Sequence, residues 1–149
     1  MSRAVSLLLE SVRNQEEQAR LRYQKSLADL EICRKNLDAI NDYREIYSGE
    51  LNDAGKGIMK TSTLTQFNSF ISRLDTAAAD QAASLRQAEA FVERCREDYQ
   101  ALQTRRKGLE KLLEKEAEEI RAAAAKAEQK LMDESALHSH MRRQRQEGM

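Results

Sequence analysis

The sequence has no proline and no tryptophan, and only 5% of its 149 residues are aromatic. With so few large apolar side chains, a compact globule of this size is disfavoured, whereas a long helical assembly needs to bury only a stripe. Without proline, glycine is the main residue left to interrupt a helix, and three of the five glycines lie between residues 49 and 57. Disorder is the competing interpretation of so polar a chain, and strict apolar periodicity would exclude it.

Net charge of one sign is also absent, because 25 basic residues balance 25 acidic ones. A balanced chain lacks the basic face that nucleic-acid binding requires, so we expect no nucleic-acid partner. No apolar run approaches the roughly 18–20 residues of a membrane span, and the start of the chain does not resemble a secretory signal. We therefore expect a cytoplasmic protein without direct membrane insertion.

Cysteine is scarce, with Cys33 and Cys95 alone. The pair has no CxxC spacing and no accompanying histidine cluster, so both are interpreted as small, mostly buried apolar side chains rather than metal ligands.

What the sequence does contain is a heptad repeat in two parts. In the first, ten of thirteen positions spaced by three and four residues are apolar. These seam positions are Leu9, Val12, Glu16, Ala19, Tyr23, Ser26, Leu30, Cys33, Leu37, Ile40, Arg44, Tyr47 and Leu51. This spacing is typical of a coiled coil, with position a at Leu9 and d at Val12.

The second part starts at Leu64 and keeps its register to Met141, with 18 of 23 seam positions apolar. These positions are Leu64, Phe67, Ile71, Leu74, Ala78, Gln81, Leu85, Ala88, Val92, Cys95, Tyr99, Leu102, Arg106, Leu109, Leu113, Glu116, Ile120, Ala123, Ala127, Lys130, Glu134, Leu137 and Met141. A disordered chain has no reason to keep such a register. A strict seven-residue period predicts two long helices with left-handed supercoiling.

The glycine-rich stretch separates the two seams. Gly55 is suited to end the first helix, and Thr63 with Gln66 has the spacing of a capping box for the second. We expect one all-α domain over 1–149: helix one about 3–54, a turn about 55–62, helix two about 63–143, and a flexible tail over 144–149. A short turn makes the helices antiparallel, which gives a two-helix coiled coil, or helical hairpin.

The predicted helices differ in length. A turn centred near residue 58 places Leu9 opposite the region of Arg106, so helix two overhangs helix one after about residue 110. The apolar seam continues through this overhang, which predicts an external partner. The alternative is an exposed alanine-rich helix held by its own propensity and charge pairs. The same register puts Cys33 near residues 82–84, roughly 18 Å from Cys95, so both thiols should be free.

No pattern indicates chemistry. Between Gly49 and Gly55 stand five residues rather than the four of a phosphate-binding loop, and Gly57 follows Lys56 where a hydroxyl is needed. His138 and His140 lie two residues apart and point to different faces of a helix. The carboxylates lie on long exposed faces with no pocket. We expect no enzyme, no cofactor and no metal.

Two aromatic residues flank the seam beside the turn. Tyr43 and Phe70 both occupy position g, and the g rows of an antiparallel pair lie on the same side. We expect them to sit together above Tyr47, Ile40 and Leu74. Large flanking aromatics favour a binding patch; the alternative is that they widen the core at the tip of the hairpin.

These residues also carry a resemblance to a known family. "YREIYSGELNDAGKGI", "FNSFISRLDTA" and "EQKLMDESA" resemble the flagellar export protein FliJ family, over about residues 8–141. The resemblance implies a non-enzymatic, cytoplasmic component of the type III export apparatus, peripheral at the inner face of the membrane, with the stalk-like hairpin of rotary ATPases. It implies three partners: the export ATPase, bound by the end that carries both termini, the cytoplasmic domain of the export gate, and export chaperones.

The resemblance also implies site residues. The gate-binding surface of the family carries over onto Asn36, Ile40, Tyr43, Tyr47, Phe70, Leu74, Ala77 and Gln81, although the family leads one to expect histidine at Gln81. For the ATPase, the candidate contacts lie along the overhang at Leu113, Ile120, Ala127 and Leu131.

Two other functions remain open at this stage. The first is a structural scaffold or homodimer, in which the long helices of two chains would pair with each other instead of each chain folding back on itself as a monomer. The related stalk of a virulence secretion system shares the same architecture.

Overall fold

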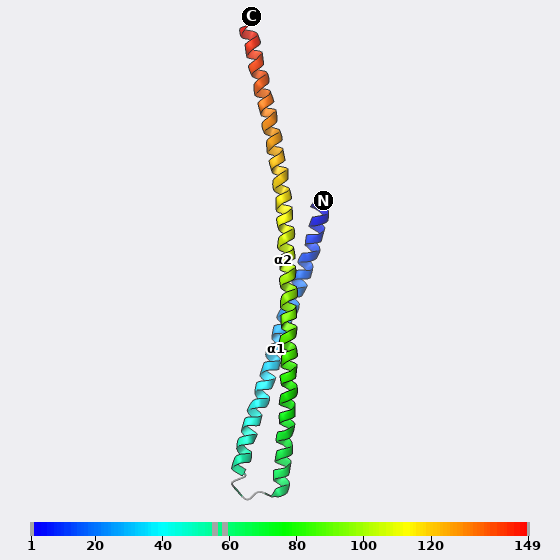
Figure 1. The fold of residues 1–149 in the computed structure, drawn as a ribbon, viewed down its shortest axis with the longest axis vertical. Coiled ribbons are helices and arrows are strands. Elements are labelled where there is room, and N and C mark those ends of the chain that lie inside the picture. The colour runs from blue at the N-terminus through cyan, green and yellow to red at the C-terminus, as the bar shows by residue number, and fades with distance from the viewer. Residues whose placement is uncertain (1, 55–56, 58–59, 149) are drawn as a thin grey trace. The chain divides into compact units, whose positions relative to one another are not determined.

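The computed structural model describes residues 2–54, 57 and 60–148, and the described part contains two α-helices and no strand. Helix α1 spans Ser2–Ala54 and helix α2 spans Thr61–Glu147. Figure 1 shows α1 in blue to cyan and α2 in green to red. The two helices pack against each other as the predicted all-α helical hairpin.

The start of α2 differs from the expectation. The backbone N–H groups of Thr63 and Leu64 both donate to the carbonyl of Lys60, at 3.1 Å. Lys60 is therefore the residue that precedes the first helical turn, and Thr63 lies inside the helix, so the predicted Thr63–Gln66 capping box is wrong. The helix begins at Thr61 rather than 63 and continues to Glu147, beyond the expected end at 143. The expected helix-ending Gly55 lies outside the described residues.

The predicted seam is the buried stripe of the hairpin. Every seam position from Leu9 to Leu51 is buried or half-buried, and so is every seam position from Leu64 to Glu116. The most buried side chains on α1 include Val12 at 1% exposure and Ala19 at 0%. Burial of a single stripe on each helix is what a coiled coil with a strict heptad repeat produces.

Contacts divide the chain into two compact units, Met1–Arg13 with Thr104–Met149, and Asn14–Gln103. In the second unit the rings of Tyr23 and Tyr99 lie 6.2 Å apart, and Arg44 Nε donates to Asp75 Oδ1 at 2.8 Å. Both contacts join residues far apart in sequence, as antiparallel helices require.

In the unit formed by Met1–Arg13 and Thr104–Met149, a cross-helix ion pair joins Arg13 and Glu110 at 3.2 Å. Val5 is half-buried and lines a shallow groove with Leu112 and Glu116. The first turns of α1 thus cover α2 as far as Glu116. The expected overhang from residue 110 is wrong for this reason: the uncovered stretch begins at Ala117, and Leu113 is half-buried.

Both cysteines are free thiols, as predicted, with Cys95 buried and Cys33 half-buried. The seam also buries one hydroxyl, that of Ser26, at 2% exposure. Its Oγ donates to the carbonyl of Tyr23 at 2.6 Å, so a polar side chain is accommodated without an unsatisfied group.

Candidate protein-interaction surfaces

The sequence-predicted gate-binding residues divide into exposed and half-buried groups. Asn36, Tyr43 and Phe70 are exposed, whereas the other five are half-buried, four of them on the seam and Ala77 beside it. Those five are Ile40, Tyr47, Leu74, Ala77 and Gln81. The exposed residues offer side chains to a partner, and the half-buried ones hold the two helices together beneath them.

Tyr47 is the centre of an aromatic cluster. Its ring lies 4.8 Å from that of Phe70 and 5.8 Å from that of Phe67, both in edge-to-face geometry. Such pairs add to the stabilisation from apolar burial. The cluster therefore holds Phe70 in place while leaving 39% of its surface exposed.

Tyr43 does not pair with Phe70 as expected. Within the described residues, the aromatic ring partner of Phe70 is Tyr47, and the ring of Tyr43 contacts no other aromatic ring. Tyr43 is 56% exposed instead. The seam residue Tyr47, one turn further along α1, makes the ring contact with Phe70 across the helix pair instead.

The two flanks of α1 before the turn differ in chemistry. One carries Ile32, Asn36, Ala39, Tyr43 and Ile46, all exposed and all uncharged. We name these five residues, together with Phe70, the aromatic face. The other flank carries Glu31, Arg34, Asp38, Asn41 and Glu45, of which four are charged. We name these five residues the charged face.

Ile32 and Ile46 of the aromatic face were missed by sequence reasoning. Both occupy position c, one step outside the flanking g row that was considered, and both are more than half exposed. Two exposed isoleucines beside Tyr43 were a detectable signal, since c and g positions lie next to each other on the helix. They widen the apolar surface available to a partner.

A second candidate surface is the stretch of α2 from Ala117 to Glu147, in which every side chain is exposed. Among the candidate ATPase contacts, Ile120, Ala127 and Leu131 lie here, and Ile120 and Leu131 are 63% and 66% exposed. Leu113 lies before it and is half-buried. The stretch also exposes Met132, Leu137 and Met141.

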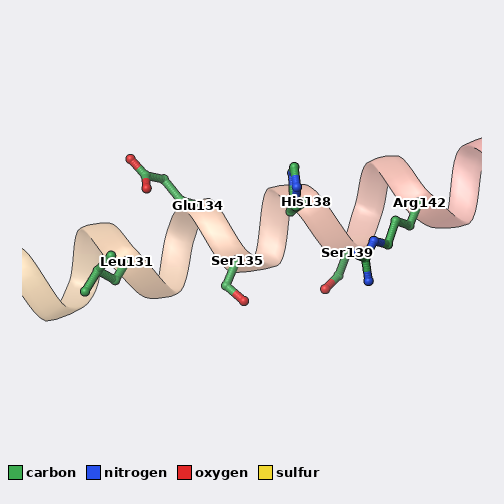
Figure 2. A pocket seen from close by; sticks show the side chains of 6 residues that line it. All are labelled: Leu131, Glu134, Ser135, His138, Ser139 and Arg142. Atoms are coloured by element: carbon green, nitrogen blue, oxygen red, sulfur yellow. The ribbon is translucent and has the colours of Figure 1, made fainter.

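A shallow groove near the end of α2 is lined by Leu131, Glu134, Ser135, His138, Ser139 and Arg142. Figure 2 shows all six side chains rising from one helix, with Glu134 and His138 on one side and the two serines on the other. Side chains of a single helix form no enclosing wall. The groove is therefore open to solvent and is not the enclosed kind of cavity that usually holds a small molecule.

A repeated local pattern lies within Asn14–Gln103. Glu17, Arg20 and Tyr23 on α1 have the same spacing as Glu93, Arg96 and Tyr99 on α2. In each copy the glutamate pairs with the arginine three residues later. The hydrogen bonds from Arg20 and Arg96 hold the pKa of Glu17 and of Glu93 below the usual range of a carboxyl. The tyrosines of the two occurrences of this pattern, Tyr23 and Tyr99, lie with their rings 6.2 Å apart.

A further carboxylate bridges the helices near the start of α1. Hydrogen bonds from Arg13 and then Arg106 lower the pKa of Glu110. Its partners come from both helices, so this ion-pair network sets which turns lie side by side. Arg13 is exposed, whereas Arg106 and Glu110 are half-buried, and ion pairs this accessible to solvent each contribute little stability.

Within the described part of the chain, no group of three or more metal-ligating side chains is close enough to hold an ion. The imidazole of His140 is within hydrogen-bonding distance of the Gln144 amide, at 3.3 Å. None of the described helices has a stretch apolar enough to cross a membrane.

No curated protein and no solved structure matches the chain. The family model of the flagellar FliJ protein matches residues 1–145. Since the match covers nearly the whole chain, and the two helices pack as a hairpin, this protein belongs to the FliJ family, whose members are non-catalytic components of flagellar export.

Proposed function

We propose that this protein is a non-enzymatic, stalk-like adaptor that links the export ATPase to the export gate and escorts export chaperones. Its place would be the cytoplasm, peripheral to the inner face of the membrane. The observation that carries the proposal is the aromatic face, an uncharged surface flanked on the same helix by a charged one. Binding requires no reaction from this chain, only a stiff helix pair that presents exposed side chains.

The cytoplasmic domain of the gate is the proposed ligand of the aromatic face. Tyr43 and Phe70 present large, partly exposed rings, and Phe70 is held by Tyr47, so little ordering is needed on binding. Exposed aromatics surrounded by small uncharged side chains are typical of residues that dominate a binding free energy. Ile46 extends this surface by one helical turn.

Binding of the purified gate domain to full-length protein tests this proposal. Tyr43→Ala and Phe70→Ala should each weaken the complex about tenfold, a loss of roughly 1–2 kcal/mol. Glu45→Ala, on the charged face, is the matched control and should bind as the original chain does. Circular dichroism should show equal helicity for Tyr43→Ala. If Tyr43→Ala and Phe70→Ala bind the gate normally, the aromatic face is not the gate site.

For the ATPase we propose the exposed stretch of α2, through Ile120, Ala127 and Leu131. Leu113 contributes less, because the first turns of α1 half-bury it. Chaperone escort is proposed from family membership, and no particular surface of this chain is assigned to it. The match to the flagellar family favours flagellar export over a virulence secretion system.

A further inference from the structure

The exposed stretch of α2 from Ala117 to Glu147 keeps the heptad seam without a covering helix from its own chain. Continued to Glu147, the register gives eight seam positions: Ile120, Ala123, Ala127, Lys130, Glu134, Leu137, Met141 and Gln144. Two of the eight, Lys130 and Glu134, are charged, and they carry opposite charges. A helix that packs against this seam must place an acidic group opposite Lys130 and a basic group opposite Glu134. It must also place large side chains opposite Ala123 and Ala127.

A second copy of the same stretch, running antiparallel, meets those conditions. In an antiparallel coiled coil, position a of one helix faces position d of the other. When Lys130 faces Glu134 of the second copy, the two-fold symmetry makes Glu134 face Lys130 in turn. The same register sets Ala127 against Leu137, Ala123 against Met141 and Ile120 against the aliphatic stem of Gln144. Each small side chain then faces a large one, and each charge faces its opposite.

Other arrangements lose this complementarity. A parallel pair would set Lys130 against Lys130 and Glu134 against Glu134. An antiparallel pair shifted by one heptad sets Ala127 against Lys130, or Glu134 against Leu137. Only the first register satisfies both charges.

The same register is compatible with the described extent of the exposed stretch. With Lys130 facing Glu134, the last helical residue, Glu147, faces Ala117, which is the first uncovered residue of α2. The second copy would thus cover the stretch from end to end and stop where α1 begins to cover α2. The paired length is roughly 45 Å at 1.5 Å per residue.

Two further observations concern the flanks and the charges. Leu131, 66% exposed, occupies position e and would lie beside Leu131 of the second copy at the two-fold axis. Among the described residues, neither Lys130 nor Glu134 makes an ion pair within the chain, so both charges are available. One feature opposes the pairing: Asp133, at position g, would approach Asp133 of the second copy.

We propose that the Ala117–Glu147 stretch is a self-association surface, which pairs antiparallel with a second copy through reciprocal Lys130–Glu134 contacts. This inference goes beyond the proposed function and does not rest on it. Self-pairing covers Ile120, Ala127 and Leu131, the proposed ATPase contacts. A paired chain would therefore be unable to offer them until the pair separates.

Sedimentation of the purified full-length protein over a range of concentrations tests the proposal. The mass should rise from 17.1 kDa towards twice that value as concentration increases. Lys130→Glu and Glu134→Lys should each weaken association about tenfold, because each places like charges together twice. Combining the two substitutions should restore it. Asp133→Asn should strengthen it.

Cross-linking locates the two-fold axis. In a background with Cys33→Ser and Cys95→Ala, Leu131→Cys should form a disulfide between copies, whereas Gln129→Cys, on the outer side of the helix, should not. A mass that stays at 17.1 kDa at all concentrations would assign the stripe to a different protein and overturn the proposal. So would association that survives either single charge reversal, or that the combined reversal fails to restore.

Discussion

Helix α2 contains two regions built on one heptad register, and their surroundings differ. From Leu64 to Glu116 every seam position is at least half-buried, and thirteen of the sixteen are apolar. From Ile120 to Met141 every seam position is exposed, two of seven are charged, and two of the others are alanine. The register alone does not distinguish a covered stripe from an open one. The difference arises from where α1 begins, and from side-chain size and charge along the stripe.

The largest expected difference between the two regions is in the free energy of unfolding. Leu30→Ala removes a seam leucine that is 6% exposed and should cost about 2–4 kcal/mol. Leu137→Ala removes one that is 57% exposed and should cost less than about 0.5 kcal/mol. Urea unfolding followed by circular dichroism measures both. Equal losses would mean that the exposed stretch contributes to the cooperative core of the folded chain.

An intermediate effect is expected from enlarging alanine. Ala78 and Ala127 both occupy position a on α2, but Ala78 is 5% exposed and Ala127 is open. Ala78→Leu should destabilise the hairpin by about 1–3 kcal/mol, because the facing helix leaves no room. Ala127→Leu should leave the melting temperature unchanged in dilute solution. A neutral Ala78→Leu would show that the helices are further apart than their burial indicates.

The smallest expected effect is a dependence of thermal stability on pH, which arises in the covered region. The pKa values of Glu17 and Glu93 are lowered in the folded state by their arginine partners, so the folded state favours the charged carboxylates. Their stabilisation is complete above the unfolded carboxyl pKa, about 4.3, and is lost as pH falls through the lower folded value. Thermal melts between pH 7 and pH 3 should show this loss. Glu17→Gln with Glu93→Gln should reduce the slope, and high salt should weaken the effect. A slope unchanged in the double variant would assign the acid sensitivity to other carboxylates, such as Glu110.

Much of the fold could be predicted from the sequence because the a and d positions of a heptad repeat lie on one face of each helix, and that face packs against the partner helix. The seam from Leu9 to Leu51 and from Leu64 to Glu116 is buried as expected, and the free state of Cys33 and Cys95 followed from the same register. These features depend on spacing alone. The FliJ resemblance rested on the turn region and on late motifs, and the family match confirms it.

The features that were missed depend on end positions and on individual side chains. The uncovered stretch begins at Ala117 rather than near 110 because the first turns of α1, before the first counted seam residue, also pack on α2. The helix start at Thr61 depends on the Lys60 carbonyl accepting the first hydrogen bonds, and the pattern of threonines did not identify it. The ring contact of Phe70 with Tyr47 rather than Tyr43 depends on which ring reaches across the seam.

The alternation of small and large side chains along the buried seam has a mechanical consequence. Ala19 and Ser26 are almost fully buried, and both lie close to Tyr23, whose ring lies against that of Tyr99. Sliding one helix past the other by a heptad, roughly 10 Å, would separate the rings of Tyr23 and Tyr99 and break the Arg44–Asp75 hydrogen bond. The two helices of Asn14–Gln103 should therefore resist sliding past each other along their length. A force applied to one helix would be carried by the other without loss of alignment.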